Sequence, residues 1–247
     1  MQAHSWFSEW FNSPYYHLLY SNRDEGEAKQ FINRLIEYLQ PKQEARMLDV
    51  GCGRGRHSRH LATLGFDVTG IDVAPENIQF ANQYASTHLN FQVHDMRKTF
   101  CAHCMDYVFN FFTSFGYFEN AHEHVRALHT MAVALKKRGT LVLDYVNFDF
   151  VIQHLIEKEE RIIEQVRFDI TRWHDARFLY KKMVVHDENK STTLTYTEKV
   201  AKFTQEELGK MIQQQGLQIN QIAGNYQLQA FDKKQSPRLI FIAQRLY

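Results

Sequence analysis

The chain is poor in cysteine, proline and glycine, and neither sign of charge prevails. Its 247 residues include three cysteines, too few for the disulfide framework of a small secreted domain. Four prolines and 11 glycines provide no Pro- or Gly-rich linker between separate domains. Lys and Arg together number 29 and Asp and Glu 28, which gives a formal net charge of +1. This balance argues against a protein that binds nucleic acid through a general basic field.

Long hydrophobic runs are also missing. The uncharged stretch at residues 107–118 spans twelve residues, some of them polar, whereas a membrane span needs about 18. At the N-terminus no Lys or Arg precedes Arg23 and no apolar h-region is present, so we expect no signal peptide. These absences predict a cytoplasmic protein that does not act in a membrane.

Two of the cysteines, Cys101 and Cys104, lie close together in the pattern C-A-H-C. A tetrahedral zinc site needs four ligands, usually as two spaced pairs, and the sequence holds no second C-x-x-C. We therefore expect an incidental pair of reduced cysteines in a loop, and no metal site.

The residues that are present predict a folded α/β protein, since 44% are hydrophobic and 14% aromatic. Helical spacing of apolar residues predicts a helix over 24–40, which Pro41 ends. Downstream, short apolar strands alternate with amphipathic helices, a pattern typical of a parallel sheet covered on both faces. The expected strands are 47–50, 66–72, 91–94, 107–111 and 140–145, and the expected helices include 75–86 and 121–135.

The pattern changes after about residue 150. Residues 160–200 alternate β-branched and aromatic residues with polar ones, which predicts antiparallel strands with a hairpin turn at 187–190. A capping box at 204–207 predicts another helix. The sequence thus indicates a parallel core with a β-rich excursion that returns to the same sheet. The closing strands are expected at 217–222 and 239–243.

The strongest signal is a glycine-rich turn, Gly51-Cys52-Gly53-Arg54-Gly55, between a predicted strand and a predicted helix. Glycines at such a turn let the backbone approach a ligand closely. Asp72 stands 21 residues after Gly51, at the end of the second strand, where a carboxylate can bind both hydroxyls of a ribose. The combination predicts an adenosine-type cofactor laid across the strand ends.

Two residues bear on which cofactor this is. The dinucleotide fingerprint G-x-G-x-x-G requires a third glycine at position 56, where this chain has Arg56. Asp49, at the mouth of the turn, would repel a pyrophosphate but suits a ligand with an ammonium or sulfonium group. Together they favour S-adenosyl-L-methionine over NAD, with an NAD-dependent oxidoreductase as the alternative.

Residues 49–57, Gly70-Ile71-Asp72 and His94-Asp95-Met96 together resemble the class I S-adenosylmethionine-dependent methyltransferases. The resemblance covers residues 24–145 and extends to 204–247. It implies a Rossmann-like, mostly parallel sheet of seven strands in which only the last is antiparallel, with helices on both faces. It also implies contacts of Asp49, Gly51, Cys52 and Gly53 with the methionine part of the cofactor, of Asp72 with the ribose, of Val73, Asp95 and Met96 with the adenine, and of Asn110 and Phe111 near the methyl group.

Residues 10–17 (W-F-N-S-P-Y-Y-H) and 112–118 (F-T-S-F-G-Y-F) resemble a group of bacterial small-molecule methyltransferases with an aromatic N-terminal lid and a β-hairpin insertion. The resemblance implies a lid over the cofactor, with Tyr16 and Arg23 as contacts. A dimer contact or a stretch of core is the other interpretation of this segment. The expected division is a cofactor-binding core at 1–149 and 204–247, with the lid at 1–23, and an antiparallel insertion at 150–203 that covers the acceptor.

Methyl transfer from a sulfonium needs no obligatory catalytic residue, because the cofactor carries the reactive group. A protonated acceptor needs a base, and the candidates are Tyr145, after the fifth strand, and His174 in the insertion. The insertion lacks a basic patch with interleaved aromatics, so we expect a small-molecule acceptor and no nucleic acid. The protein would be a monomer or a homodimer, and a catalytically silent protein with a methyltransferase fold is a further alternative.

Overall fold

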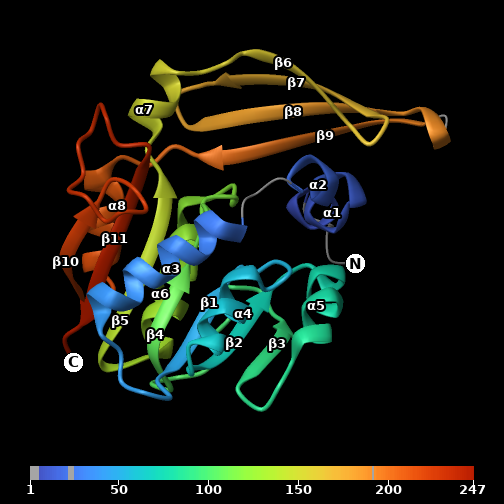
Figure 1. Ribbon diagram of the computed structural model, residues 1–247. Helices are drawn as coiled ribbons and strands as arrows, with labels where there is room; N and C mark the ends of the chain where they lie inside the picture. The colour runs from blue at the N-terminus through green and yellow to red at the C-terminus, as the bar shows by residue number, and fades with distance from the viewer. Residues whose placement is uncertain (1–5, 22–24, 191) are drawn as a thin grey trace.

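The computed structural model describes residues 6–21, 25–190 and 192–247, and contains two β-sheets (Figure 1). The larger sheet consists of β1 (Arg46–Val50), β2 (Asp67–Asp72), β3 (Leu89–Val93), β4 (Met105–Asn110), β5 (Leu135–Val146), β10 (Leu217–Ala223) and β11 (Arg238–Arg245). Its strand order is β10-β11-β5-β4-β1-β2-β3. Neighbouring strands pair in parallel except at β11, which is antiparallel to both β5 and β10. The predicted seven-stranded fold, with only its last strand antiparallel, is confirmed.

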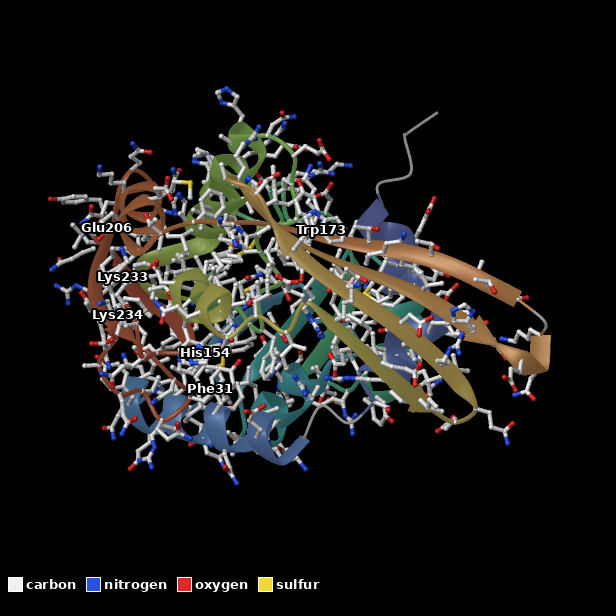
Figure 2. The ribbon with its side chains drawn as sticks, turned by 90° about the horizontal axis from the view of Figure 1, so that it is seen from above. Phe31, His154, Trp173, Glu206, Lys233 and Lys234 are labelled. Atoms are coloured by element: carbon white, nitrogen blue, oxygen red, sulfur yellow. A yellow bond between two sulfur atoms is a disulfide. The ribbon has the colours of Figure 1, made fainter. Side chains whose placement is uncertain are left out.

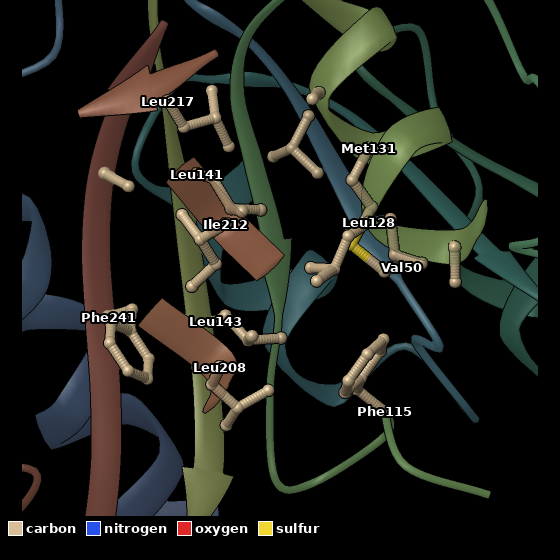
Figure 3. Packing of buried hydrophobic residues seen from close by; sticks show 14 of the residues in the cluster. Val50, Phe115, Leu128, Met131, Leu141, Leu143, Leu208, Ile212, Leu217 and Phe241 are labelled. Carbon is tan, nitrogen blue, oxygen red and sulfur yellow. The ribbon is translucent and has the colours of Figure 1, made fainter. Parts of the chain in front are cut away.

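Helices cover both faces of this sheet (Figure 1): α3 (Glu25–Leu39), α4 (Arg56–Thr63), α5 (Pro75–Ala81), α6 (Ala121–Ala134) and α8 (Gln205–Gln213). On one face, Leu128 of α6 lies near Val50 of β1 and Ile212 of α8 lies near Leu141 of β5, all within one apolar cluster (Figure 3). On the other face, α3, α4 and α5 pack against the opposite side of β1 at Met47. Burial on both faces explains the apolar residues Met47, Leu48 and Val50 of β1; Asp49 is the buried polar residue of this strand.

The helix ends follow capping signals in the sequence. The hydroxyl of Thr204 accepts a hydrogen bond from the Glu207 amide at 3.1 Å, and the Glu207 carboxylate accepts one from the Thr204 amide at 2.8 Å. This capping box starts α8 where it was predicted. Gly65, with φ +91°, follows the last residues of α4 and ends that helix, because its left-handed conformation suits glycine.

Two local predictions were wrong. β5 begins at Leu135, before the predicted strand, because Leu135 already pairs with Met105 of β4. The helix predicted at 75–86 ends as α5 at residue 81 and continues as a 3-10 turn, η1 (Asn82–Tyr84), since the chain must reverse near Ser86 to enter β3. Cys101 and Cys104, expected to be a reduced pair in a loop, lie with their Cα atoms 6.2 Å apart and their sulfur atoms adjacent.

The second sheet is antiparallel and lies within the predicted insertion. Its order is β6-β7-β8-β9, and α7 (Phe148–Gln153) leads into it from β5. The turn η2 (Glu188–Lys190) joins the third strand to the fourth, at the predicted hairpin. We call this sheet the insertion sheet; its strands are β6 (Lys158–Ile163), β7 (Val166–His174), β8 (Phe178–Asp187) and β9 (Thr192–Ala201).

Two short helices, α1 (Trp6–Asn12) and α2 (Pro14–Leu19), pack on the insertion sheet. Trp10 and Tyr15 are buried in one apolar cluster with Phe168 and Met183 of the sheet. The Tyr15 hydroxyl also donates a hydrogen bond to the Asp187 carboxylate at 2.8 Å. Figure 1 shows α1 and α2 between the insertion sheet and α5, and Figure 2 shows the strands extending across them. The N-terminal helices and the insertion sheet therefore form one packed layer over the carboxyl ends of the parallel strands.

Candidate functional site

A cavity of about 540 Å³ lies at the carboxyl ends of β1 to β4, beneath the N-terminal helices and the insertion sheet. Ligands of open α/β sheets bind in this position. The cavity is large enough for a small-molecule ligand site. Its lining includes Phe11, Tyr16, His17, Tyr20, Ser21, Gly51, Cys52, Gly53, Arg54, Arg56, His57, Arg59, Asp72, Val73, Asn77, Phe80, Tyr84, His94, Asp95, Met96, Phe111, Phe112, Ser114, Tyr117, Phe118 and Glu198.

The glycine turn forms one wall of the cavity. Gly51 and Gly53 have φ values of +75° and +55°, which favour residues without a Cβ. A Cβ on Gly51 would lie 2.6 Å from the Ser114 Cβ, whereas a Cβ on Gly53 would meet nothing within 4 Å. Gly51 is thus required for close packing against the loop after β4, and Gly53 leaves the backbone open to a ligand.

Asp72 links the turn to the second strand. Its half-buried carboxylate accepts hydrogen bonds from the Gly53 amide at 2.9 Å and the Ala74 amide at 2.8 Å. Burial raises the pKa of Asp72, and hydrogen bonds from Ala74, Gly53, Asn77 and Val73 oppose that rise. Asp72 also lines the cavity, so its carboxylate can meet the hydroxyl groups of a ligand. This geometry fits the ribose of an adenosine-type cofactor.

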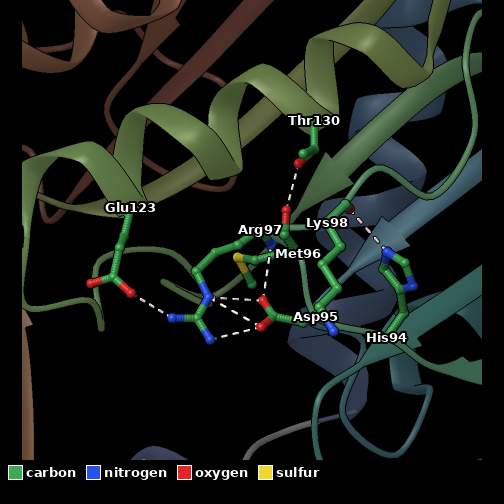
Figure 4. Close-up of polar contacts among 7 residues, drawn as sticks. All are labelled: His94, Asp95, Met96, Arg97, Lys98, Glu123 and Thr130. Carbon is green, nitrogen blue, oxygen red and sulfur yellow. Dashed lines mark hydrogen bonds and ion pairs between the residues drawn. The ribbon is translucent and has the colours of Figure 1, made fainter.

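Val73, Asp95 and Met96 also line the cavity, as the resemblance implied. The Asp95 carboxylate is held by Arg97, with an Nη2–Oδ2 distance of 2.7 Å (Figure 4). Burial would raise the pKa of Asp95, but the hydrogen bonds from Arg97 outweigh it and hold the pKa below its usual range. Thr130 donates a hydrogen bond to the Met96 carbonyl. Ionic and hydrogen-bonded contacts therefore fix the loop after β3 in place.

Asp49 lies behind the turn and is absent from the cavity lining. Its carboxylate accepts a hydrogen bond from the Ser58 hydroxyl of α4 at 2.6 Å. Burial raises the pKa of Asp49 to about 7. Asp49 thus joins β1 to α4. Because its side chain does not line the cavity, it is not placed to contact the methionine part of a cofactor directly.

Replacing Asp49 with asparagine is expected to change how stability depends on pH. Between about pH 4 and pH 7, the folded protein holds a proton on Asp49 that the unfolded chain has released, because the folded pKa is raised. The free energy of unfolding therefore falls as pH rises through this window and levels off above it. We expect the variant to match the parent at pH 4 and to exceed it by about 4 kcal/mol at pH 8, since the pKa differs by about three units between the folded and unfolded states. Urea unfolding at both pH values measures this; a difference independent of pH would contradict it.

Asn110 and Phe111 are neighbours in the sequence, but only one of them lines the cavity. Phe111 lines the cavity, but Asn110 is fully buried beneath it and donates a hydrogen bond from Nδ2 to the Val50 carbonyl at 2.8 Å. The next residues, Phe112 and Thr113, have φ values of +53° and +58°. This conformation is costly for residues other than glycine, so surrounding contacts must hold it.

Those contacts come from a buried ion pair that the sequence analysis missed. Asp144 of β5 accepts hydrogen bonds from the Phe112 amide and from Arg238 Nε, both at 2.8 Å. Arg238 also donates to the Thr113 hydroxyl at 3.0 Å. Ser114 then faces the glycine turn and donates to the Gly51 carbonyl at 3.1 Å. The pair therefore positions the loop that closes the cavity after β4.

The N-terminal helices contribute Phe11, Tyr16, His17 and Tyr20 to the cavity lining. The Tyr16 ring packs edge-on against Phe11, with ring centroids 5.1 Å apart. Burial lowers the pKa of His17 to about 4, so its ring is neutral at pH 7. Arg23, the other predicted contact of this segment, lies outside the described residues.

Neither candidate base lines the cavity. Tyr145 is fully buried, and its hydroxyl donates a hydrogen bond to the Ala201 carbonyl. His174 is exposed at the end of β7. The rule that strand ends carry ligand contacts fails for Tyr145, because the connection between the insertion sheet and α8 covers it. In the described ranges, no three His, Cys, Asp or Glu side chains are grouped to hold a metal ion, and no described helix is long and apolar enough to cross a membrane.

Comparisons with known proteins identify the family. A sequence model described as a methyltransferase domain matches residues 20–222. A putative methyltransferase, YqeM, from Bacillus subtilis is 27% identical over 213 residues, which cover 82% of this chain and 85% of that protein. These matches favour a methyltransferase over the two alternatives, which were an NAD-dependent oxidoreductase and a catalytically silent protein with a methyltransferase fold.

Solved structures agree with this fold. An S-adenosylmethionine-dependent methyltransferase from Clostridium acetobutylicum matches with a TM-score of 0.77 and 15% identity, covering 94% of this chain and 96% of that one. An amino pentose methyltransferase from Micromonospora echinaspora, solved with S-adenosylmethionine bound, matches with a TM-score of 0.70 and 22% identity, covering 94% and 97%. The chain belongs to the S-adenosylmethionine-dependent methyltransferases, and S-adenosyl-L-methionine is its cofactor.

Proposed function

We propose that the cavity binds S-adenosyl-L-methionine along the strand ends and a small-molecule acceptor beneath the insertion sheet. The observation that carries this proposal is the pairing of the open Gly53 backbone with the Asp72 carboxylate, which accepts a hydrogen bond from the Gly53 amide and lines the cavity. Gly51, Cys52 and Gly53 would lie along the methionine part, and Asp72 would bind the ribose hydroxyls.

The adenine would pack on Val73, with Asp95 and Met96 at its amino edge. Phe111 would lie near the methyl group, and Tyr16 would cover the cofactor from the N-terminal helices. Asp49 and Asn110 do not line the cavity, so we give them a positioning role: Asp49 holds α4 through Ser58, and Asn110 holds the end of β1. We do not retain Tyr145 or His174 as bases.

The cofactor supplies a methyl group on a positively charged sulfur, so the chain's task is to bind, orient and exclude water. The packed layer of N-terminal helices and insertion sheet would do this by covering the strand ends. Such a covered cavity suits a small molecule better than a nucleic acid. We further propose that the enzyme acts in the cytoplasm as a monomer or a homodimer.

Turnover tests the proposal directly. The purified protein is incubated with methyl-labelled S-adenosylmethionine and a small-molecule extract, and separately with RNA and with protein fractions. We expect S-adenosylhomocysteine to form only with the small-molecule extract. Label transferred to RNA or protein would contradict the acceptor class. Calorimetry should give binding of S-adenosylmethionine and S-adenosylhomocysteine but not of NAD; no binding of the first two would contradict the site itself.

A further inference from the structure

The part of the cavity wall that comes from the insertion sheet carries one charged side chain among the described lining residues, Glu198 of β9. The N-terminal helices add Phe11, Tyr16 and Tyr20 beside it, and Tyr117 comes from the loop after β4. The lining arginines Arg54, Arg56 and Arg59 come instead from the glycine turn and α4. The wall formed by the N-terminal helices, β9 and the loop after β4 thus holds several aromatic rings together with His17, Ser21 and one carboxylate, that of Glu198.

Neutral groups hold the Glu198 carboxylate in position. Trp10 Nε1 donates a hydrogen bond to Oε1 at 2.7 Å, and the Tyr20 hydroxyl lies 2.9 Å from Oε1 and 3.2 Å from Oε2. No ion pair with Glu198 occurs within the described ranges. The ammonium of Lys181, the residue opposite Glu198 on β8, donates to the Tyr20 hydroxyl at 2.6 Å and lies 4.5 Å from the centroid of the Tyr20 ring. Oε2 of Glu198 accepts a hydrogen bond from Tyr20 alone among the described residues, so it keeps acceptor capacity for a ligand.

The neighbouring rings form a continuous aromatic surface. Ring centroids are 5.2 Å apart between Phe11 and Tyr117, and 5.0 Å apart between Tyr16 and Tyr20. The faces of such rings attract a cation, and the attraction strengthens where water is excluded. A carboxylate beside several aromatic rings is complementary to a protonated amine that carries apolar or planar substituents.

We infer that the acceptor is an amine, and that Glu198 is the side chain that selects it. The inference rests on the proposed function, since it places the acceptor opposite the glycine turn. In the transfer, the deprotonated amine nitrogen forms a bond to the methyl carbon while the carbon–sulfur electron pair goes to sulfur. The protonated amine that the site binds gives one proton to solvent before this step, and the N-methylammonium product keeps its charge.

The arginines that line the cavity do not favour an anionic acceptor over an amine. Each guanidinium lies over an aromatic ring: Arg54 is 4.5 Å from the Phe80 centroid and Arg59 is 3.7 Å from that of Tyr84. Phe80 and Tyr84 follow β2, on the side of the cavity assigned to the ribose and adenine. Arg56 lies 4.5 Å from the centroid of Phe112, in the loop after β4, so all three guanidinium groups already contact a ring. An anionic ligand is left as an outcome of the test.

The test uses matched probes on the protein loaded with S-adenosylhomocysteine. Benzylamine, benzyl alcohol and benzoate share a ring and differ in the group offered to Glu198. We expect calorimetry to give binding of benzylamine at least about tenfold tighter than that of the other two. Tighter binding of benzoate would assign an anionic acceptor, and equal binding of all three would remove the role of Glu198; either result overturns the inference.

The Glu198→Gln variant separates charge from structure. Its amide oxygen can still accept the hydrogen bonds from Trp10 and Tyr20, but the negative charge is lost. We expect the preference for benzylamine to disappear while S-adenosylhomocysteine binds as before. Glu160→Gln, the same change on an exposed position of β6, is the matched control and should keep the preference. If Glu198→Gln keeps the preference for benzylamine, the inference is overturned. If the unmodified protein does not bind S-adenosylhomocysteine at all, the proposed function is refuted instead.

Discussion

Replacing Asp72 with alanine is expected to weaken binding of S-adenosyl-L-methionine by about 100-fold, because two hydrogen bonds from hydroxyl groups to a carboxylate are lost. The effect should be large because the carboxylate also orders the glycine turn: it accepts hydrogen bonds from the amides of Gly53 and Ala74. Without it, these amides lose their partner, and the turn loses the conformation that leaves its backbone open to the ligand.

Calorimetric titration of the variant with S-adenosylmethionine measures this loss. Asp67→Ala is the matched control, because Asp67 begins the same strand and is partly exposed at the opposite edge of the sheet. Circular dichroism should give the same folded signal for both variants at the titration temperature. Undiminished affinity in folded Asp72→Ala would remove this carboxylate from the cofactor site.

Replacing Trp10 with alanine is expected to release the N-terminal helices from the insertion sheet and to speed dissociation of the cofactor about 10- to 100-fold. Trp10 is 1% exposed, lies in the cluster between helices and sheet, and donates to Glu198. Removal of such a buried ring costs about 3–5 kcal/mol. Because α1 and α2 are short, their docking depends on this cluster. Their loss would uncover the cavity on the side of Tyr16 and His17.

Stopped-flow displacement of bound S-adenosylhomocysteine measures the dissociation rate. Trp173→Ala offers the matched control, since Trp173 lies at the end of β7 in the same sheet, is 41% exposed and does not line the cavity. Deletion of residues 1–22 should accelerate dissociation at least as much as Trp10→Ala. Parent-like rates in both the deletion and Trp10→Ala would show that these helices are a structural support and not a lid.

The local parts of the site could be predicted from the sequence because they depend on residues close together in the chain. The glycine turn, Asp72 and Asp95 each follow a strand whose apolar pattern is clear, and parallel strand ends meet at one edge of a sheet. The seven-stranded order needed the family resemblance, since alternation of strands and helices alone allows more than one order.

The parts that could not be predicted depend on contacts between distant residues. Asp144 and Arg238 stand in separate strands, and no local pattern marks them as partners of the loop at Phe112. Tyr145 resembled a cavity residue because it ends a strand, but the chain at Ala201 covers it. Glu198 lies in a stretch of polar residues that predicts a solvent-exposed strand. It lines the cavity only because the insertion sheet packs over the carboxyl ends of the parallel strands.

The docking of α1 and α2 on the insertion sheet also sets an order of folding during synthesis. Trp10 and Glu198 are separated by 188 positions in the sequence, so their hydrogen bond spans most of the chain. The ribosome adds about 5–20 residues per second, so the N-terminal helices leave it many seconds before β9 exists. During that time, Trp10 and Tyr15 have no native surface to cover. These helices are thus synthesised long before they can reach their place, and the cavity becomes enclosed only after β9 has been translated.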